Sequence, residues 1–364
     1  ELRNTLAKSF AMALTDTDAV INQIMNDFEE ELFLTSDRDD LVALRKTELQ
    51  GELYNQVLLD GMPTNLPKPF MFSITPAKHH PDYENVREKI SRTLVLYDNA
   101  GEHFEPGMDS VDNPTTRHIL YSDTIYFLFD PTKDVRFRER LTGQKDPQLE
   151  RGARVQRQEV LLTEMINRIE KYSGRRVRRN TDQTLIIVVS KCDIWQHLLG
   201  YEIPRHPWRW DPNWKTCALD MDTIMSTSYA VRALLDDICP ELVTSAEAFA
   251  GNIIFLPNSA LGCSPELNAI TGMLGVRPRD IEPFWVTVPM LCLFHLHGLM
   301  PILDQSLWTP RETVDVTCSV SGDFVFVNLP GEEIPLQIPR FYAGCRLRCP
   351  RTGQWFTLPA PEEI

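Results

Sequence analysis

Residues 184–193 have the sequence Thr-Leu-Ile-Ile-Val-Val-Ser-Lys-Cys-Asp, and this stretch decides the predicted fold. The uninterrupted run of apolar and β-branched residues over 184–189 favours a strand that is buried on both faces of a sheet. Polar residues follow at once, so we expect the strand to end at Ser190. Ligands of open α/β sheets bind beyond the carboxyl ends of the strands, which makes residues 190–193 a candidate binding loop.

Segments on both sides of this strand extend the pattern. Four further strands are predicted at residues 70–75, 93–97, 124–129 and 252–256. Apolar residues at helical spacing predict helices over residues 1–34, with a break at 15–18, and over residues 153–172, 219–238 and 283–303. Apolar strands that alternate with helices indicate the α/β class, and we expect a mostly parallel, doubly wound sheet.

The C-terminal part has a different pattern. Short strands and turns replace the helical spacing from Thr313 onward, so we predict one domain over residues 1–308 and a small β module over residues 309–364. Residues 194–218 contain four of the seven Trp residues and three Pro, and we predict an irregular insertion there.

The composition excludes several classes of protein. Lys and Arg total 37 against 51 Asp and Glu, a formal charge of −14, which makes nucleic acid an unexpected partner. No apolar run reaches the roughly 18 residues that a membrane span requires, and the first residues lack a signal-peptide pattern. The eight Cys residues are scattered, as is typical of reduced thiols. We therefore expect a cytoplasmic protein that acts through protein partners.

Three predicted strands are each followed by a polar loop. Residues 98–102 read Asp-Asn-Ala-Gly-Glu, residues 190–193 read Ser-Lys-Cys-Asp, and residues 258–261 read Asn-Ser-Ala-Leu. Each loop alone is a weak signal, because such short patterns occur by chance in a chain of this length. The three together, in this order and each at a strand end, are a much stronger one.

These loops resemble the third, fourth and fifth motifs of the Ras-like GTPases, D-x-x-G, [NT]-K-x-D and S-A-[KL]. The wider phrasing, LYDNAGEHFEPG, YSDTIYFLFDPT, IIVVSKCDIW and FLPNSALG, is similar to the bacterial double-GTPase proteins of conflict and signalling systems. The similarity runs from about residue 1 to residue 305. It implies a P-loop GTPase-like fold and binding of GTP or GDP with Mg²⁺.

The resemblance implies a guanine site at the second and third loops. Asp193 would accept two N–H groups of guanine, and the stem of Lys191 would lie over the base. The backbone N–H of Ala260 would read the guanine carbonyl oxygen, with Ser259 beside it in the S-A motif. Ser190 stands where the family has Asn or Thr, which is a mild departure.

The resemblance also implies a phosphate and metal site at the first loop. Asp98 would hold the water shell of Mg²⁺, and the N–H of Gly101 would reach the γ-phosphate. Glu102 stands at the position of the Gln that orients the attacking water, so we expect slow catalysis. Thr64 is the first choice for the switch threonine, and Thr47 is the second.

The phosphate loop G-x-x-x-x-G-K-[ST] is absent from the sequence. We expect either truncation before Glu1 or a degenerate GTPase, and in both cases GTP binding no tighter than about millimolar. The predicted function is a guanine-nucleotide-binding switch or assembly protein, with hydrolysis only if a phosphate loop precedes residue 1. The alternative is a pseudo-GTPase scaffold that binds a protein without nucleotide turnover.

The C-terminal module resembles a zinc ribbon that has lost its metal. Two segments, beginning at Cys318 and Cys349, follow the knuckle pattern C-P-x-C-G-x-[FW], but Ser321 and Thr352 replace the second Cys of each knuckle. Hydroxyl groups are poor zinc ligands, and Cys345 is a third thiolate only if its strand turns toward the site, so we expect no zinc. An apolar core would then have to come from Phe324, Val325, Phe326, Leu347, Trp355 and Phe356.

Overall fold

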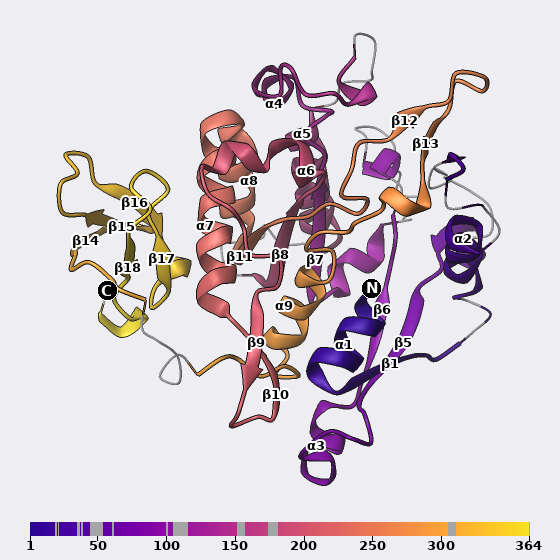
Figure 1. The fold of residues 1–364 in the computed structure, drawn as a ribbon, viewed down its shortest axis with the longest axis horizontal. Helices are drawn as coiled ribbons and strands as arrows, with labels where there is room; N and C mark the ends of the chain where they lie inside the picture. Colours follow the sequence, from indigo (N-terminus) through magenta and orange to yellow (C-terminus); the bar gives the residue numbers. More distant parts are fainter. Residues whose placement is uncertain are drawn as a thin grey trace.

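The protein is a mixed α/β structure with one parallel sheet and several small antiparallel sheets (Figure 1). The computed structural model describes residues 1–18, 20, 22–34, 37, 39–43, 54–59, 62–99, 101–104, 116–150, 157–173, 181–304 and 311–363. The predicted α/β class is confirmed. The parallel sheet that the structure describes has three strands, in the order β11-β8-β7.

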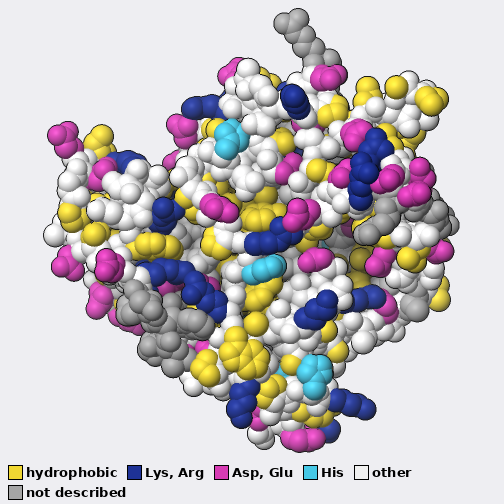
Figure 2. All heavy atoms as spheres, in the orientation of Figure 1, with side chains coloured by type: hydrophobic (Ala, Val, Ile, Leu, Met, Phe, Trp, Pro, Cys, Tyr) yellow, Lys and Arg dark blue, Asp and Glu magenta, His cyan; other side chains and the backbone are white. Residues whose placement is uncertain are grey.

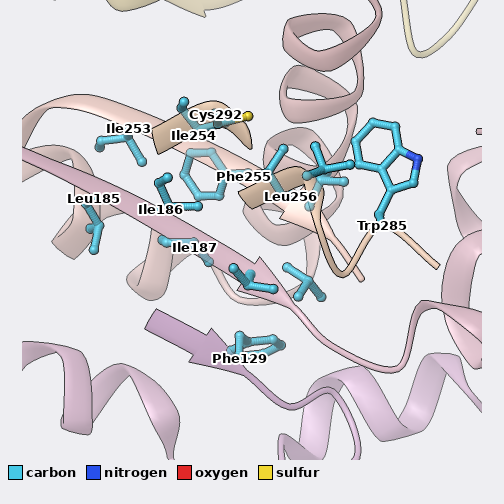
Figure 3. Close-up of a cluster of buried hydrophobic side chains, with 14 of the residues drawn as sticks. Phe129, Leu185, Ile186, Ile187, Ile253, Ile254, Phe255, Leu256, Trp285 and Cys292 are labelled. Carbon is cyan, nitrogen blue, oxygen red and sulfur yellow. The ribbon is translucent and has the colours of Figure 1, made fainter. Parts of the chain in front are cut away.

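The parallel sheet is built from the predicted apolar segments. Its strands are β7 (Thr124–Phe129), β8 (Thr181–Val189) and β11 (Ala250–Pro257). β8 lies in the centre, where Thr184 pairs with Thr124 on one side and Asn252 on the other. Residues 184–189 are all buried, as a strand covered on both faces requires. Figure 3 shows their side chains packed with those of β11 and with Cys292 and Trp285.

Helices cover this sheet. α5 (Gln158–Ser173), α7 (Met221–Ile238), α8 (Pro240–Phe249) and α9 (Val288–Leu296) all contribute buried residues to the same core. α7 and α8 pack against β11. The Tyr126 hydroxyl of β7 donates to the Pro289 carbonyl of α9 over 3.2 Å. The predicted helices at residues 153–172, 219–238 and 283–303 are therefore present with shifted ends.

The N-terminal region differs from the prediction of helices over residues 1–34 with a break at 15–18. α1 (Leu2–Phe10) and α2 (Gln23–Phe33) flank a strand, β1 (Met12–Asp16). Ala11 adopts the left-handed conformation and ends α1, after which Met12 and Leu14 alternate inward as in a strand. β1 pairs antiparallel with β5 (Phe70–Pro76), which pairs antiparallel with β6 (Arg92–Leu96). This antiparallel sheet shares its core with the parallel sheet.

The predicted irregular insertion contains regular structure. A hairpin is formed by β9 (Trp208–Asp211) and β10 (Thr216–Leu219), after the short helix α6 (Cys192–Trp195). The remaining elements are short and lie outside the predicted segments. They are β2 (Val42–Ala43), β3 (Tyr54–Leu59), β4 (Met62–Pro67), α3 (Tyr83–Ile90), α4 (Val135–Arg140), β12 (Glu266–Leu267) and β13 (Leu274–Val276).

The C-terminal module is an all-β unit with its own core, at the left of Figure 1. It contains the antiparallel sheet β14 (Thr317–Ser321), β15 (Phe324–Asn328) and β16 (Leu336–Pro339), and the pair β17 (Arg346–Arg348) and β18 (Trp355–Thr357). Of the six predicted core residues, Val325, Leu347 and Phe356 are fully buried and the others are half-buried.

This module packs on α7. Tyr229 of α7 belongs to the core of the module, and the hydroxyl groups of Ser228 and Tyr342 share a hydrogen bond of 2.9 Å. Ser226 accepts the backbone N–H of Arg348 over 3.1 Å. The predicted boundary at residue 308 lies outside the described residues.

Candidate functional site

Two of the predicted binding loops lie side by side. Residues 190–193 follow β8 and residues 258–262 follow β11, and we call them the paired loops. Their strands are parallel neighbours, so both loops leave the sheet at the same edge. Backbone hydrogen bonds of 2.9 Å join them, from the Asn258 N–H to the Val189 carbonyl and from the Cys192 N–H to the Asn258 carbonyl.

A serine and a carboxylate fix the geometry between the paired loops. The Ser259 hydroxyl donates to Asp193 Oδ1 over 2.5 Å and accepts the Gly262 N–H over 2.9 Å. Ser259 is 2% exposed, whereas Asp193 is half-buried and Ala260 is exposed. Within the part of the chain that the structure describes, Asp193 Oδ2 and the Ala260 N–H have no hydrogen-bond partner. The loops therefore present one fixed acceptor and one backbone donor.

Lys191 is held by three oxygen atoms. Its ammonium group donates to Asp130 Oδ2 over 2.9 Å, to Thr132 Oγ1 over 2.8 Å and to Gln148 Oε1 over 2.7 Å. The backbone of Lys191 is left-handed, with φ of 54°. These contacts keep the side chain extended over the loop that follows β7, so its apolar stem is fixed in place.

The sequence patterns did not predict the three oxygen partners of Lys191. Asp130 comes directly after β7, and the strand-end argument that selected residues 190–193 applies to it equally. Gln148 lies in a stretch that carries no strand-end signal, and only the folded chain brings it to Lys191.

Ser190 has a structural role in this arrangement. Both its N–H and its hydroxyl donate to the Phe129 carbonyl, over 2.9 and 3.0 Å, and so connect the ends of β8 and β7. The Ser190 carbonyl accepts the indole N–H of Trp195 over 2.8 Å, and Trp195 is completely buried. The first residue of the loop is thus fixed from both sides.

The first of the three predicted loops, residues 98–102, follows a strand of the other sheet. Asp98 comes after β6, which belongs to the β1-β5-β6 sheet, and Gly101 begins a short 3₁₀ helix. The Asp98 side chain reaches solvent, yet desolvation by the surrounding protein raises the pKa of its carboxyl group. The Asn99 amide lies 3.1 Å from the His118 ring. In the described part of the chain, no hydrogen bond or ion pair joins Asp98 to the paired loops.

The two predicted catalytic residues remain predictions. Thr64 lies in β4 opposite Val57, and Glu102 lies in the 3₁₀ helix Gly101–Phe104, but both side chains are outside the description. Thr47, the second choice for the switch threonine, is also outside the described residues.

The described residues contain no group of three or more His, Cys, Asp or Glu side chains that is arranged to hold a metal ion. The three Cys residues of the C-terminal module are free thiols, and burial raises the pKa of Cys345 to about 11. For Mg²⁺, Asp98 is the one predicted ligand.

The fold and the paired loops define the molecule as a mixed α/β protein with a polar loop pair at a parallel-sheet edge. No family model, no curated protein and no solved structure matches the chain. The described residues include no helix with the length and apolar character of a membrane span.

Gly262→Ala is expected to distort the paired loops. Gly262 has φ of +73°, and an added Cβ would lie 1.9 Å from the Glu282 carbonyl oxygen. We expect the free energy of unfolding to fall by about 2 kcal/mol, because the left-handed strain and the backbone clash act together. Gly272→Ala is the matched control, since Gly272 has φ of +68° and open space around it. Urea denaturation measures both, and equal losses would contradict the role of the clash.

Proposed function

We propose that the protein binds a guanine nucleotide at the paired loops and acts as a nucleotide-controlled switch or assembly protein. The hydrogen bond from Ser259 to Asp193 is the observation that carries this proposal. It fixes one carboxylate oxygen and leaves Oδ2 without a hydrogen-bond partner among the described residues. A guanine base offers N–H groups at N1 and at the exocyclic amine, which match a carboxylate acceptor.

Two further features support the choice of guanine. The backbone N–H of the exposed residue Ala260 would be a donor for the guanine carbonyl oxygen, where adenine carries an amine. The extended stem of Lys191, fixed by Asp130 and Gln148, supplies an apolar surface for the face of a base. An adenine base would direct its N1 lone pair at the carboxylate, which is repulsive.

The residues present fit the guanine base of GTP or GDP. Binding of the phosphates would depend on side chains that the structure does not describe, such as those of Thr64 and Glu102. Asp98 is the described candidate for the Mg²⁺ water shell, and Mg²⁺ would neutralise phosphate charge there. A doubly wound P-loop arrangement of the two sheets is part of the same proposal. It would place the loop after β6 at the edge where the paired loops lie.

Base selectivity tests the proposal with mononucleotides, since these depend least on the phosphate site. We expect GMP to bind about 10-fold or more tightly than AMP, because AMP loses two hydrogen bonds and gains one repulsive contact. Asp193→Asn should remove this preference and favour XMP, whose carbonyl at C2 accepts from the Asn amide. Saturation-transfer NMR titrations at millimolar concentrations measure the affinities for GMP, AMP and XMP.

Asp315→Asn is the matched control, because Asp315 is an exposed carboxylate in the C-terminal module. It removes the same charge and should leave the preference for GMP unchanged. Equal affinity of the unmodified protein for GMP and AMP would contradict guanine recognition.

A scaffold without nucleotide turnover is the second candidate, and the insertion supports it. Trp210 and Trp214, on the β9–β10 hairpin, are 58% and 51% exposed. Exposed Trp side chains are enriched at protein interfaces. Binding of neither GMP nor AMP at millimolar concentration would favour this function over the switch.

A further inference from the structure

A cavity of about 280 Å³ lies where the C-terminal module meets the body of the protein. Its walls come from three separate parts of the chain: the loop 201–204, the first two turns of α7, and four residues of the module. The module residues are Arg311, Arg348, Gly353 and Trp355. We call this cavity the seam pocket. It shares no residue with the paired loops, so a ligand in the seam pocket would not depend on nucleotide binding at those loops.

Charge is unevenly compensated around the seam pocket. Arg311 forms an ion pair with Asp220 at 2.7 Å, and the neighbouring Arg346 pairs with Asp222 at 3.2 Å. Arg348 differs, because within the described residues it has no carboxylate at ion-pair distance. It is half-buried, and a guanidinium group in such a place is stabilised by an anion. Figure 2 shows Lys and Arg side chains between the module, at the left, and the body of the molecule, with Asp and Glu side chains beside them.

The Arg348 guanidinium group is fixed in orientation, and some of its N–H groups have no hydrogen-bond acceptor among the described residues. Its plane lies over the ring of Tyr201, at 4.7 Å from the centroid, and its Nε donates to the Gly353 carbonyl over 3.0 Å. Its two terminal nitrogens donate to no described protein group. A Cβ at residue 353 would lie 3.0 Å from Arg348 Nη2, so glycine keeps this side of the fork open. A fixed fork with free N–H groups matches the two oxygens of a carboxylate or phosphate.

A second donor lies beside the fork. The hydroxyl of Tyr201 is buried and has no hydrogen bond of good geometry, although the Thr227 side chain is next to it. Burial also raises the pKa of Tyr201, so the hydroxyl keeps its proton at neutral pH. A buried hydroxyl without a partner costs free energy, and an oxyanion would accept its hydrogen bond.

The rest of the wall is partly apolar and partly polar. The ring of Trp355 lies under Arg311, at 4.4 Å from its centroid, and Pro204 also lines the pocket. The hydroxyl side chains of α7 and the exposed Glu202 supply the polar part. Small-ligand sites combine such apolar walls with a few polar groups that set orientation. The volume suits one ring or one side chain.

We propose that the seam pocket binds a small aryl oxyanion, with the anionic head on the Arg348 fork and the Tyr201 hydroxyl and the ring against Trp355. Phenyl phosphate is the probe. Its binding to the whole chain, measured by calorimetry and by the indole NMR signal of Trp355, is expected with a dissociation constant of about a millimolar or below. Inorganic phosphate should bind at least about 10-fold more weakly, because it lacks the ring.

Three variants test the named contacts. Arg348→Gln should weaken phenyl phosphate about 10-fold or more, and Tyr201→Phe, which keeps the ring and removes only the hydroxyl, about 3- to 10-fold. Arg351→Gln is the matched control, because Arg351 pairs with Glu332 away from the pocket lining, and it should leave binding unchanged. If Arg348→Gln does not fold, Tyr201→Phe carries the test.

The source of the oxyanion is distinguished by a second probe, a phosphotyrosine residue within a short Gly-flanked peptide. Binding of both probes supports a partner's side chain as the ligand, and binding of phenyl phosphate alone supports a free small molecule. The proposal is overturned if phenyl phosphate does not bind at 10 mM, if inorganic phosphate binds equally well, or if both pocket variants bind as the unmodified protein does.

Discussion

Replacing Arg311 with Leu is expected to lower the free energy of unfolding by about 3 kcal/mol, at the lower end of the range for broken buried ion pairs. The Arg311 side chain is 20% exposed and pairs with Asp220, which is 4% exposed. It also donates to the Thr223 hydroxyl over 2.6 Å. Without Arg311 the Asp220 carboxylate keeps its burial and loses its nearest counter-charge, because the remaining partner, Arg209, lies 4.0 Å away and is 51% exposed. Urea denaturation at pH 7 measures the loss.

A double variant separates the ion pair from the helix cap. Asp220 caps α7, since its carboxylate accepts the Thr223 N–H over 3.1 Å, and Ser at residue 220 retains that function. Arg311→Leu combined with Asp220→Ser should therefore recover part of the stability, because no unpaired buried charge remains. A double variant less stable than the sum of the two single changes would contradict the ion pair.

The stability that the Arg311–Asp220 ion pair contributes should depend on pH. Burial alone raises the pKa of Asp220, but Arg311 and the hydrogen bonds from Thr223 outweigh it, so the pKa in the folded protein is lowered. The stabilisation is thus present above the unfolded pKa of about 3.9 and is lost as the pH falls through the folded value. The difference in the free energy of unfolding between the unmodified protein and Arg311→Leu should therefore become smaller below about pH 4. A difference that stays constant from pH 7 to pH 3 would contradict the linkage.

Trp195→Ala is expected to cost about 4 kcal/mol of the free energy of unfolding. Trp195 is 0% exposed, packs edge-on against Phe137 with ring centroids 6.2 Å apart, and donates to the Ser190 carbonyl. Alanine leaves a cavity behind the paired loops and frees the Ser190 carbonyl. We therefore expect the affinity for GMP to fall together with stability.

Trp195→Phe is the matched comparison, because phenylalanine fills most of the space, so this change removes the indole N–H and only a small part of the ring volume. Its expected cost is about 1 kcal/mol, the usual net value of one hydrogen bond. Chemical denaturation gives both numbers. Equal losses for the two variants would mean that the cavity does not contribute.

The central strand of the parallel sheet could be predicted from the sequence because burial on both faces leaves an unbroken apolar run. Residues 184–189 have this pattern, and β8 is buried throughout them. β1 could not be predicted in this way. Leu14 fits both the helical spacing and the alternation with Met12, and the pairing of β1 with the distant β5 decides between them. A local pattern contains no information about that partner.

The residues of the candidate site could be predicted from the sequence to the same extent as the strands. Asp193 and Ser259 are found at strand ends, and the structure brings them within 2.5 Å. The glycine that the turn after Ser259 requires lies within the quoted segment FLPNSALG, but its close approach to Glu282 is a tertiary contact. Arg348 carried no functional signal in the sequence, because its importance depends on which neighbouring arginines have carboxylate partners.

The position of β8 in the centre of the parallel sheet has a consequence for refolding. Thr184 pairs with Thr124 on one side and with Asn252 on the other, and both partners are distant in sequence. Long segments of chain must therefore close before either ladder of the parallel sheet forms. In the C-terminal module, by contrast, the two-residue turn of Gly322 and Asp323 joins β14 directly to β15. Such hairpins form within about 10 μs, whereas non-local pairing is slow. We therefore expect the β14–β15 hairpin to form before the ladders of the parallel sheet.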